Sequence, residues 1–274
     1  MPELPEVETV KRGLSKQILG KKINSIFRSD KNLRFPYSNN FIEDISNAKI
    51  IDIKRRAKFL IINLNNKNSI IIHLGMSGKI LFKNSPYIPA KHDHFILEFT
   101  DETLLVFNDA RRFGCVTSSK TKDVAKHKLF ANTGIEPLSD DLTTEFLTEN
   151  FKNKSQNIKQ TLMDASVIAG IGNIYASEIL FLTNINPALP AKDVPKNKYK
   201  NLIKNIKQVL ENAIKSGGST LRDYVRSDGG LGYFQHHHKV YDRENQPCFV
   251  CQTSIKRIVQ QGRSTYFCPN CQKL

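Results

Sequence analysis

The stretch KIIDIKRRAKFLIINLNNKNSIIIHL (49–74) contains three short runs rich in Ile and Leu, separated by Arg-Ala-Lys and by an Asn-rich segment. Apolar runs of this length between turn-forming residues are typical of β-strands joined by hairpins. Similar runs lie on both sides: KINSIF (22–27), FILEF (95–99) and TLLVF (103–107). The sequence from about residue 21 to about residue 118 therefore predicts an antiparallel sandwich or barrel.

A helix is predicted immediately before these strands. The residues that recur at helical spacing are Val7, Val10, Leu14 and Ile18. Pro5 suits the first turn of such a helix, and Gly20 suits its end, because Pro is favoured inside the start and Gly just past the end.

The second half of the sequence is predicted to be helical. SQNIKQTLMD (155–164), GNIYASEILFL (172–182) and YKNLIKNIKQVLENAIKSG (199–217) each have a helical pattern, and the last carries an apolar stripe: Leu202, Ile206, Val209, Leu210 and Ala213. Gly, Pro and a helix-start signal near residues 131–150 predict a linker. We therefore expect an α+β protein with an N-terminal β domain (1–130), a linker (131–150), a helical domain with a glycine-rich loop (151–235) and a cysteine-rich tail (236–274).

The charge balance points to a polyanionic partner. The 274 residues include 41 Lys and Arg against 26 Asp and Glu, giving a net charge of +15 and a pI near 9.6, which is the electrostatic footprint of nucleic-acid binding. An A- and T-rich genome would also enrich Lys, Asn and Ile. No apolar run approaches the roughly 18 residues of a membrane span, and the first 20 residues do not resemble a secretion signal. We expect a cytoplasmic protein without membrane partners.

Four of the five cysteines lie in the last 27 residues, as two pairs with two-residue gaps: Cys248, Cys251, Cys268 and Cys271. This spacing is typical of a four-thiolate zinc ribbon. The intervening QTSIKRIVQQGRSTYF (252–267) alternates like a β-hairpin. Four reduced structural thiols are the alternative, and the histidines at 236–238 are alternative ligands. Cys115 stands alone, and we expect it to be a small buried residue.

The start of the chain, MPELPEVET, suggests a nucleophile. If Met1 is removed, Pro2 presents a secondary amine with a pKa near the ~7.7–8.0 of α-amino groups. A secondary amine that attacks an aldehyde-like carbon gives an iminium, which cannot lose its charge by deprotonation and therefore remains an electron sink. Glu3 would serve as general acid or base beside it. The alternative is an ordinary helix start whose acids complement the helix dipole.

Five motifs occur together and in order: MPELPEVET, HLGMSG (73–78), NDARRFG (108–114), GIGNIYASE (170–178) and the cysteine tail. This set resembles the bacterial formamidopyrimidine-DNA glycosylases over the whole chain. The resemblance implies an N-terminal β-sandwich with a leading helix, a helix–two-turn–helix domain and a ribbon with one structural zinc ion. It also implies a monomeric bifunctional glycosylase and AP lyase that excises 8-oxoguanine and formamidopyrimidines from duplex DNA.

The resemblance assigns chemical roles to three residues near the start of the chain. The amine of Pro2 would attack the anomeric carbon, Glu3 would shuttle protons, and strand cleavage would follow by β- and δ-elimination. Lys58 would contact the phosphate beside the lesion; a solvated strand lysine is the alternative.

DNA contacts are implied at two further groups of positions. Met76, Arg111 and Phe113 match an intercalating triad that fills the gap left by the extruded base, with Arg111 facing the orphaned cytosine; burial in a core is the alternative for Met76 and Phe113. The remaining positions implied to contact DNA are His73, Lys159, Asn173, Tyr241 and Arg263. Asn173 begins a helix, where phosphate is favoured, although a helix cap is the alternative, and Arg263 could be a solvated surface residue.

The glycine-rich segment 217–235 would close over the extruded base through Ser219, Thr220 and Tyr224, with a plain linker as the alternative. Two departures from the family pattern are visible: Ala110 stands where Pro is usual, and DREN (242–245) replaces a stretch that usually contains Gly. Asn245 tolerates a left-handed conformation, so a tight turn is expected there. The rival functions are an endonuclease VIII-like glycosylase for oxidised pyrimidines and a non-catalytic zinc-ribbon protein that binds nucleic acid.

Overall fold

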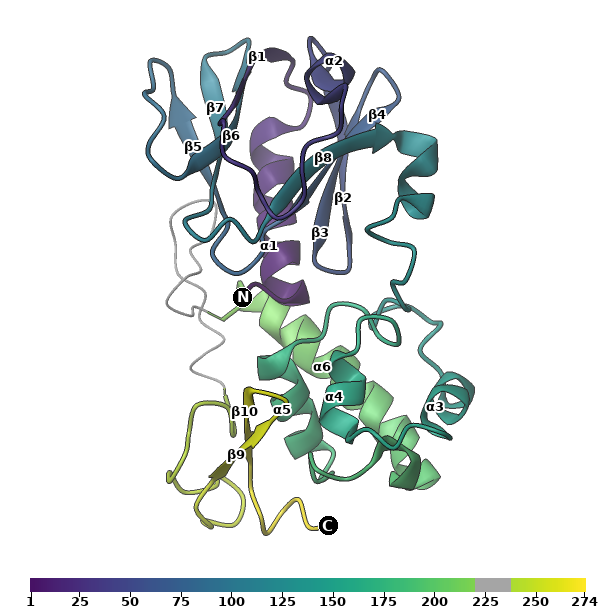
Figure 1. The fold of residues 1–274 in the computed structure, drawn as a ribbon. Helices are drawn as coiled ribbons and strands as arrows, with labels where there is room; N and C mark the ends of the chain where they lie inside the picture. Colours follow the sequence, from purple (N-terminus) through teal and green to yellow (C-terminus); the bar gives the residue numbers. More distant parts are fainter. Residues whose placement is uncertain (220–237) are drawn as a thin grey trace. The chain divides into compact units, whose positions relative to one another are not determined.

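The structure is a computed structural model that describes residues 1–219 and 238–274. These residues form two units. The first unit contains Met1–Ala131 and residues 216–219, and the second contains Asn132–Lys215 and residues 238–274. In Figure 1 the first unit is coloured mainly purple to teal and the second teal to yellow.

The first unit begins with helix α1 (Leu4–Ile18). Pro5 lies in its first turn, and Gly20, with φ of +83°, follows its end, where a left-handed conformation favours glycine. The four apolar residues of the predicted stripe are all buried. The predicted helix is therefore confirmed, and its apolar face packs on β2 and β3.

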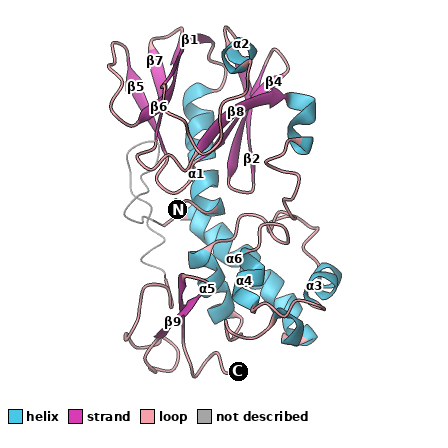
Figure 2. Ribbon diagram, viewed as in Figure 1, coloured by secondary structure: helices cyan, strands magenta, loops and turns pink. Residues whose placement is uncertain are grey.

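Within the described residues, eight strands form two antiparallel four-stranded sheets (Figure 2). The first sheet has the order β1-β6-β7-β5 and consists of Ile23–Arg28, Asp93–Phe99, Thr103–Asn108 and Lys79–Asn84. The second has the order β2-β3-β4-β8 and consists of Ile50–Arg56, Phe59–Leu64, Asn68–His73 and Cys115–Lys120. The stretch 49–74 thus forms the three consecutive strands β2, β3 and β4, as predicted.

Both sheets and α1 share one apolar core, which makes the first unit a sandwich. Phe95 and Phe107 of one sheet and Ile62 and Ile72 of the other are fully buried in the same cluster as Leu14 of α1. The short helix α2 (Phe41–Ile45) adds to this core, and the 3-10 helix η1 (Thr121–Lys126) covers part of the outer face of the second sheet.

The described residues of the second unit form helices and one β-hairpin. Its helices are α3 (Thr144–Phe151), α4 (Ile158–Met163), α5 (Asn173–Leu182), η2 (Ala191–Asp193), η3 (Lys196–Lys198) and α6 (Tyr199–Lys215). Helix α3 lies in the segment predicted as a linker, and the hydroxyl of Thr143 caps it by accepting the N–H of Phe146 at 3.1 Å. The predicted apolar stripe of α6 is buried.

The predicted hairpin in the cysteine-rich tail is confirmed. Strands β9 (Lys256–Gln260) and β10 (Arg263–Phe267) pair antiparallel. Gln261 and Gly262 form the turn with φ of 45° and 73°, the left-handed geometry of a two-residue hairpin loop. Asn245 also adopts a left-handed φ of 64°, as expected. None of the helices that the structure describes combines the length and apolar character of a bilayer crossing.

Candidate functional site

The start of α1 is buried and anchored by Glu6. Pro2 is buried and Glu3 is only 3% exposed. The backbone N–H of Glu3 donates to Oε2 of Glu6 at 2.8 Å, and the backbone N–H of Ser219 donates to Oε1 of the same carboxylate at 2.8 Å. One carboxylate thus fixes the first residues of the chain and the first residue predicted for the lesion loop.

Gly218 allows this approach of the chain to Glu6. It has φ of +81°, and a Cβ atom there would lie 2.9 Å from Oε1 of Glu6. The other two residues predicted for the loop, Thr220 and Tyr224, lie outside the described residues.

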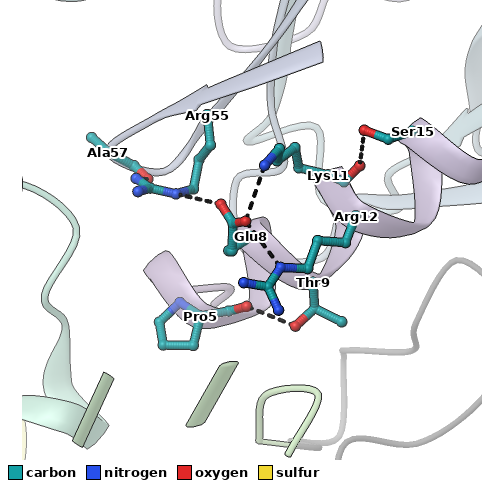
Figure 3. A network of polar contacts seen from close by, with 8 residues as sticks. All are labelled: Pro5, Glu8, Thr9, Lys11, Arg12, Ser15, Arg55 and Ala57. Atoms are coloured by element: carbon teal, nitrogen blue, oxygen red, sulfur yellow. Dashed lines mark hydrogen bonds and ion pairs between the residues drawn. The ribbon is translucent and has the colours of Figure 1, made fainter. Parts of the chain in front are cut away.

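A second carboxylate, that of Glu8, joins α1 to the turn that carries Lys58 (Figure 3). Oε2 of Glu8 accepts from Nε of Arg55 at 3.1 Å, and Nη1 of Arg55 donates to the carbonyl of Ala57 at 2.9 Å. Lys11 also donates to Glu8 from the next turn of α1.

Burial alone would raise the pKa of Glu8, but Lys11, Arg12 and Arg55 together lower it. Glu8 is therefore ionised at neutral pH. Ala57 has φ of 52°, a costly conformation for alanine, which the Arg55 contact helps to hold immediately before Lys58.

Two loops carry the residues predicted to intercalate. Met76 lies half-buried in the turn between β4 and β5, and Arg111 and Phe113 are exposed in the loop between β7 and β8. Phe113 is 42% exposed, so the core alternative is wrong for this residue. The guanidinium of Arg111 lies 4.9 Å from the centre of the Phe113 ring, which is a cation–π contact.

His73 lies at the end of β4, beside these loops. Its Nδ1 accepts the N–H of Gly75 at 3.1 Å. Burial, with the charges of Lys58 and Arg34, lowers the pKa of His73 to about 4. The ring is therefore neutral at pH 7, and its contribution at this pH is that of a hydrogen-bonding group.

In the second unit, Lys159 and Asn173 form a buried polar cluster with β10. Lys159 is 1% exposed, and its Nζ donates to Oδ1 of Asn173 at 2.6 Å, to the carbonyl of Ser264 at 3.0 Å and to the hydroxyl of Thr265 at 2.7 Å. Nδ2 of Asn173 donates to the carbonyl of Ser264 at 3.0 Å. The cap residue of α5 is Gly172, so the cap alternative for Asn173 is wrong.

This arrangement leaves a basic hollow beside β10. A cavity of about 250 Å³ is lined by Lys159 and Arg263, together with Gln156, Gln160, Met163, Asp164, Gln260 and Gln261. Arg263 is exposed at the start of β10, while Lys159 mainly orients Asn173 and the hairpin. An anion in this hollow would meet one exposed guanidinium, several amide groups and one carboxylate.

Tyr241 is positioned by a residue that the sequence reasoning missed. Glu178 on α5 is buried, and its carboxyl group accepts the backbone N–H groups of Lys239, Val240 and Tyr241 at 2.7, 3.0 and 2.8 Å. Burial raises the pKa of Glu178, although these hydrogen bonds oppose the shift. The sequence does carry a signal for this role, because Glu178 is the one acid in the otherwise mostly apolar stretch NIYASEILFL. A buried acid requires hydrogen-bonding partners, so its position in an apolar helix indicates that it binds another segment.

The four cysteines of the tail form one closed metal site. Their sulfur atoms all lie within 4.8 Å of one another, and the only such group found in the described residues is this one. Individual S···S distances are 3.4 Å, 3.5 Å and 3.9 Å. A tetrahedral zinc ion with bonds of about 2.3 Å places its ligands roughly 3.8 Å apart.

Backbone groups around the cysteines also fit a metal. The N–H groups of Val250 and Cys271 point at the sulfur atoms of Cys248 and Cys268, both at 3.4 Å. Such donors stabilise thiolates. Burial raises the pKa of Cys268, and a bound dication removes that penalty. The donor set therefore fits one structural zinc ion, which supports the hairpin that carries Arg263.

Three family models match the chain. Residues 1–116 match the formamidopyrimidine-DNA glycosylase N-terminal domain, residues 133–225 match the formamidopyrimidine-DNA glycosylase H2TH domain, and residues 245–274 match a zinc finger found in FPG and IleRS. The H2TH model is the helix–two-turn–helix domain expected for the second unit.

Whole-length relatives agree with these matches. The chain is 46% identical over 272 residues to a formamidopyrimidine-DNA glycosylase of Rickettsia africae, covering 99% of both proteins. It is 45% identical over 274 residues to the protein of the same name from Wolbachia sp. subsp. Drosophila simulans, covering 99% of this chain and 100% of the relative.

Solved structures show the same fold. The MutM (Fpg) protein of Thermus thermophilus superimposes with a TM-score of 0.88 at 35% identity, covering 99% of this chain and 98% of that protein. Lactococcus lactis Fpg in complex with DNA containing an abasic site gives a TM-score of 0.89 at 32% identity, covering 99% of this chain and 100% of that protein. A complex of MutM with DNA containing carbocyclic 8-oxo-G gives 0.91 at 33% identity, covering 100% of both chains.

Proposed function

Because the chain belongs to the formamidopyrimidine-DNA glycosylase family, it is a base-excision repair glycosylase and AP lyase for oxidised purines, and we propose that it acts through a covalent iminium on Pro2. The observation that supports this mechanism is the buried start of α1, where Pro2 is buried and the backbone of the adjacent Glu3 is held by Glu6. A nucleophile and an acid share one anchored segment. We propose that Met1 is removed before catalysis, which frees the amine of Pro2.

The proposed first step is displacement of the base. The lone pair of the Pro2 nitrogen forms a bond to C1′ of the deoxyribose, while the glycosidic bond breaks and its electrons leave with the base, which takes up the proton that the Pro2 nitrogen loses. Glu3 protonates the ring oxygen, so the sugar opens and the nitrogen–carbon bond becomes an iminium. Because this nitrogen carries no proton, the positive charge persists as an electron sink.

Strand cleavage follows from the acidity that the iminium gives to C2′. Loss of a C2′ proton expels the 3′ phosphate in β-elimination, and a second elimination through the extended conjugated system expels the 5′ phosphate. Water then releases the sugar fragment from Pro2. Glu3 is the proposed proton carrier in these steps.

The DNA contacts are proposals of the same kind. Met76, Arg111 and Phe113 would fill the space of the extruded base, which is supported by the exposure of Arg111 and Phe113. Lys58 and His73 would contact the backbone near the lesion.

In the second unit, Asn173, Tyr241 and Arg263 would contact phosphates. Lys159 would not contact DNA directly but would hold Asn173 and the β10 strand in position. The buried ammonium of Lys159, which already donates to Asn173 and β10, supports this division of roles.

Three residues are proposed to cover the extruded base: Ser219, Thr220 and Tyr224. The support comes from Ser219, whose backbone N–H reaches Glu6 close to the start of the chain. We propose that the protein acts in the cytoplasm, at the nucleoid, and that it acts as a monomer.

Borohydride trapping on a duplex with 8-oxoguanine opposite cytosine tests the mechanism. Only an iminium is reduced to a stable protein–DNA adduct, and mass mapping of the adduct should place the added sugar on Pro2. Pro2→Gln, whose larger side chain favours retention of Met1, should lower trapping by roughly a hundredfold or more, within the range expected for loss of a covalent nucleophile.

Pro5→Ala is the matched control, because Pro5 also begins α1 but lies beyond the reacting segment. It should trap like the wild type. Fully active protein that keeps Met1, or that carries an acylated first nitrogen, would refute the mechanism. Faster release of thymine glycol than of 8-oxoguanine opposite cytosine would instead favour the endonuclease VIII-like alternative, and absence of any adduct would favour a non-catalytic binding protein.

A further inference from the structure

The two loops that carry Met76, Arg111 and Phe113 are joined by a buried hydrogen bond between side chains. Asp109 is fully buried, and its Oδ1 accepts the hydroxyl of Ser77 at 2.5 Å. Ser77 is also buried and lies immediately after Met76. A buried carboxylate that accepts a hydroxyl at this distance forms a strong charge-assisted bond.

The same carboxylate orders its own loop. The backbone N–H of Arg111 is shared between Oγ of Ser77 at 3.2 Å and Oδ1 of Asp109 at 3.3 Å, and the N–H of Gly114 donates to Oδ2 at 2.8 Å. Asp109 therefore binds both ends of the segment that presents Arg111 and Phe113, and Ser77 contributes to one of these ends from the other loop.

The backbones of the two loops are also in direct contact. A Cβ atom at Gly75 would lie 2.4 Å from the nitrogen of Gly114 and 2.4 Å from the carbonyl carbon of Phe113. The two loops therefore approach each other more closely than a residue with a Cβ atom at position 75 would allow. Gly75 has φ of +64°, so a side chain there would be disfavoured both by the backbone conformation and by the missing space.

We propose that Ser77 and Asp109 are positioning residues that couple the two loops, so that Met76, Arg111 and Phe113 enter the DNA as one rigid wedge. This inference rests on the proposed wedge role of those three side chains. Without the link, each loop would be ordered separately and the base stack would be opened less effectively, while the reacting groups on α1 would be unchanged.

Extruding a base costs unstacking energy that the wedge must offset. An abasic deoxyribose has no base to unstack. Loss of the coupling should therefore slow the excision of an intact lesion much more than the cleavage of an abasic site already present in the DNA.

The test compares Ser77→Ala with the wild type, as full-length zinc-loaded protein, in three single-turnover measurements. Excision of 8-oxoguanine should slow by roughly tenfold or more because extrusion is impaired. Cleavage of a preformed abasic site should stay within about threefold of wild type, as expected for an independent step. A 2-aminopurine beside the lesion should show a slower fluorescence rise, since this probe reports unstacking directly.

Ser118→Ala is the matched control. Ser118 is a buried serine of the same unit whose hydroxyl donates to Oδ2 of Asp44 at 2.6 Å, and no predicted DNA contact lies beside it in the sequence. Both variants lose one hydroxyl–carboxylate hydrogen bond made by a buried serine. If the effect of Ser77→Ala is only destabilisation, Ser118→Ala should reproduce it and the melting temperatures should account for both.

The outcomes separate this inference from the proposed function. Equal losses on 8-oxoguanine and abasic DNA, unchanged excision by Ser77→Ala, or an identical defect in Ser118→Ala would each overturn the coupling. Failure of the wild type itself to form a borohydride adduct with abasic DNA would instead reject the covalent mechanism. Asp109→Asn, which replaces one acceptor oxygen by an amide N–H₂ group that only donates, provides a second variant expected to show the same selective defect.

Discussion

The two units hold their candidate functional side chains by different means. In the first unit, two sheets and α1 enclose a continuous apolar core, and the carboxylates of Glu6, Glu8 and Asp109 fix loops at its margin. In the second unit, the cysteine-rich tail adds only a small apolar cluster around Phe181 and Ile255.

In that tail, metal binding and buried polar groups supply the stability that an apolar core supplies elsewhere. We therefore expect loss of one polar link to change the first unit only locally, whereas loss of an anchor in the tail should release a whole segment. A short segment that buries little apolar area depends on such staples.

The largest effect is expected for removal of zinc. Structural zinc contributes an apparent ~10–16 kcal/mol to the folding of small zinc-finger peptides, far more than any single contact in the sandwich. Cys268→Ser should therefore disorder the tail and remove the support of Arg263. Affinity for duplex DNA should fall by roughly tenfold or more, since each lost phosphate contact weakens binding, and hydrogen exchange should rise in residues 238–274 alone.

Cys115→Ser is the control for this prediction, because Cys115 is a buried cysteine of strand β8 in the first unit. It makes the same chemical change without touching the metal site. Tight DNA binding by Cys268→Ser protein that is shown to lack zinc would contradict this prediction, because the tail would then be stable without its metal.

The next largest effect is expected at Glu178. Glu178→Gln keeps the shape of the side chain but leaves one or more of three backbone N–H groups without an acceptor. The expected cost is ~1–3 kcal/mol for each buried backbone N–H group that is left unsatisfied. Faster hydrogen exchange at residues 239–241, with weaker DNA binding through Tyr241, is the measurement.

Glu211→Gln is the matched control for that change. Glu211 is an exposed glutamate on α6 of the same unit, so its substitution should alter neither quantity. If the two variants behave alike, Glu178 is not an anchor of the tail.

The sequence predicted those helices and strands whose buried residues form a clear apolar pattern. Six strands of the sandwich, α1, α4, α5, α6 and the β9–β10 hairpin correspond to apolar runs or helical stripes. The two strands without a prediction of their own, β5 and β8, are edge strands of their sheets. CVTSSK (115–120) carries a polar second half, so its pattern is weaker than that of the six predicted runs.

The candidate residues were predicted from motifs, but the groups that position them were not. Ser77 and Asp109 lie inside the motifs, yet their hydrogen bond joins loops 32 residues apart in the sequence. Arg55 and Glu8 are separated by 47 residues. Such pairs depend on strand register and turn geometry, which a single sequence does not specify.

A smaller effect is expected from pH in the first unit. His73 has a pKa of about 4 in the folded protein and about 6.5 in an unfolded chain. Between these values the unfolded state binds more protons, so the free energy of unfolding falls as pH falls from 6.5 to 4. The full contribution, present above pH 6.5, is about 3 kcal/mol at ~1.4 kcal/mol for each unit of pKa.

His73→Gln should flatten this pH dependence. The measurement is hydrogen exchange of β3 and β4 peptides, because it isolates the first unit from acid release of zinc in the tail. His127→Gln is the control: burial also lowers the pKa of His127, but no large shift is found there. An unchanged slope in His73→Gln would show that other groups cause the acid sensitivity of the sandwich.

The smallest effect distinguishes two arginines that bind the same carboxylate. Arg55 and Arg12 both donate to Glu8 at 3.1 Å, but the Arg55 side chain is 11% exposed and the Arg12 side chain is 58% exposed. Arg55→Lys loses either the Glu8 contact or the Ala57 carbonyl contact, because an ammonium cannot reproduce the guanidinium fork. We expect a loss of about 1 kcal/mol and a several-fold slower excision through displacement of Lys58.

Arg12→Lys should change stability by no more than ~0.5 kcal/mol, the usual worth of an exposed helix pair. If the two substitutions have equal effects, the Glu8 network is only a surface ion cluster and does not position the turn before Lys58. If Arg55→Lys slows excision without a matching loss of stability, the polar link acts on catalysis itself. A polar contact at the margin of the sandwich would then influence the reaction without releasing any segment of the fold.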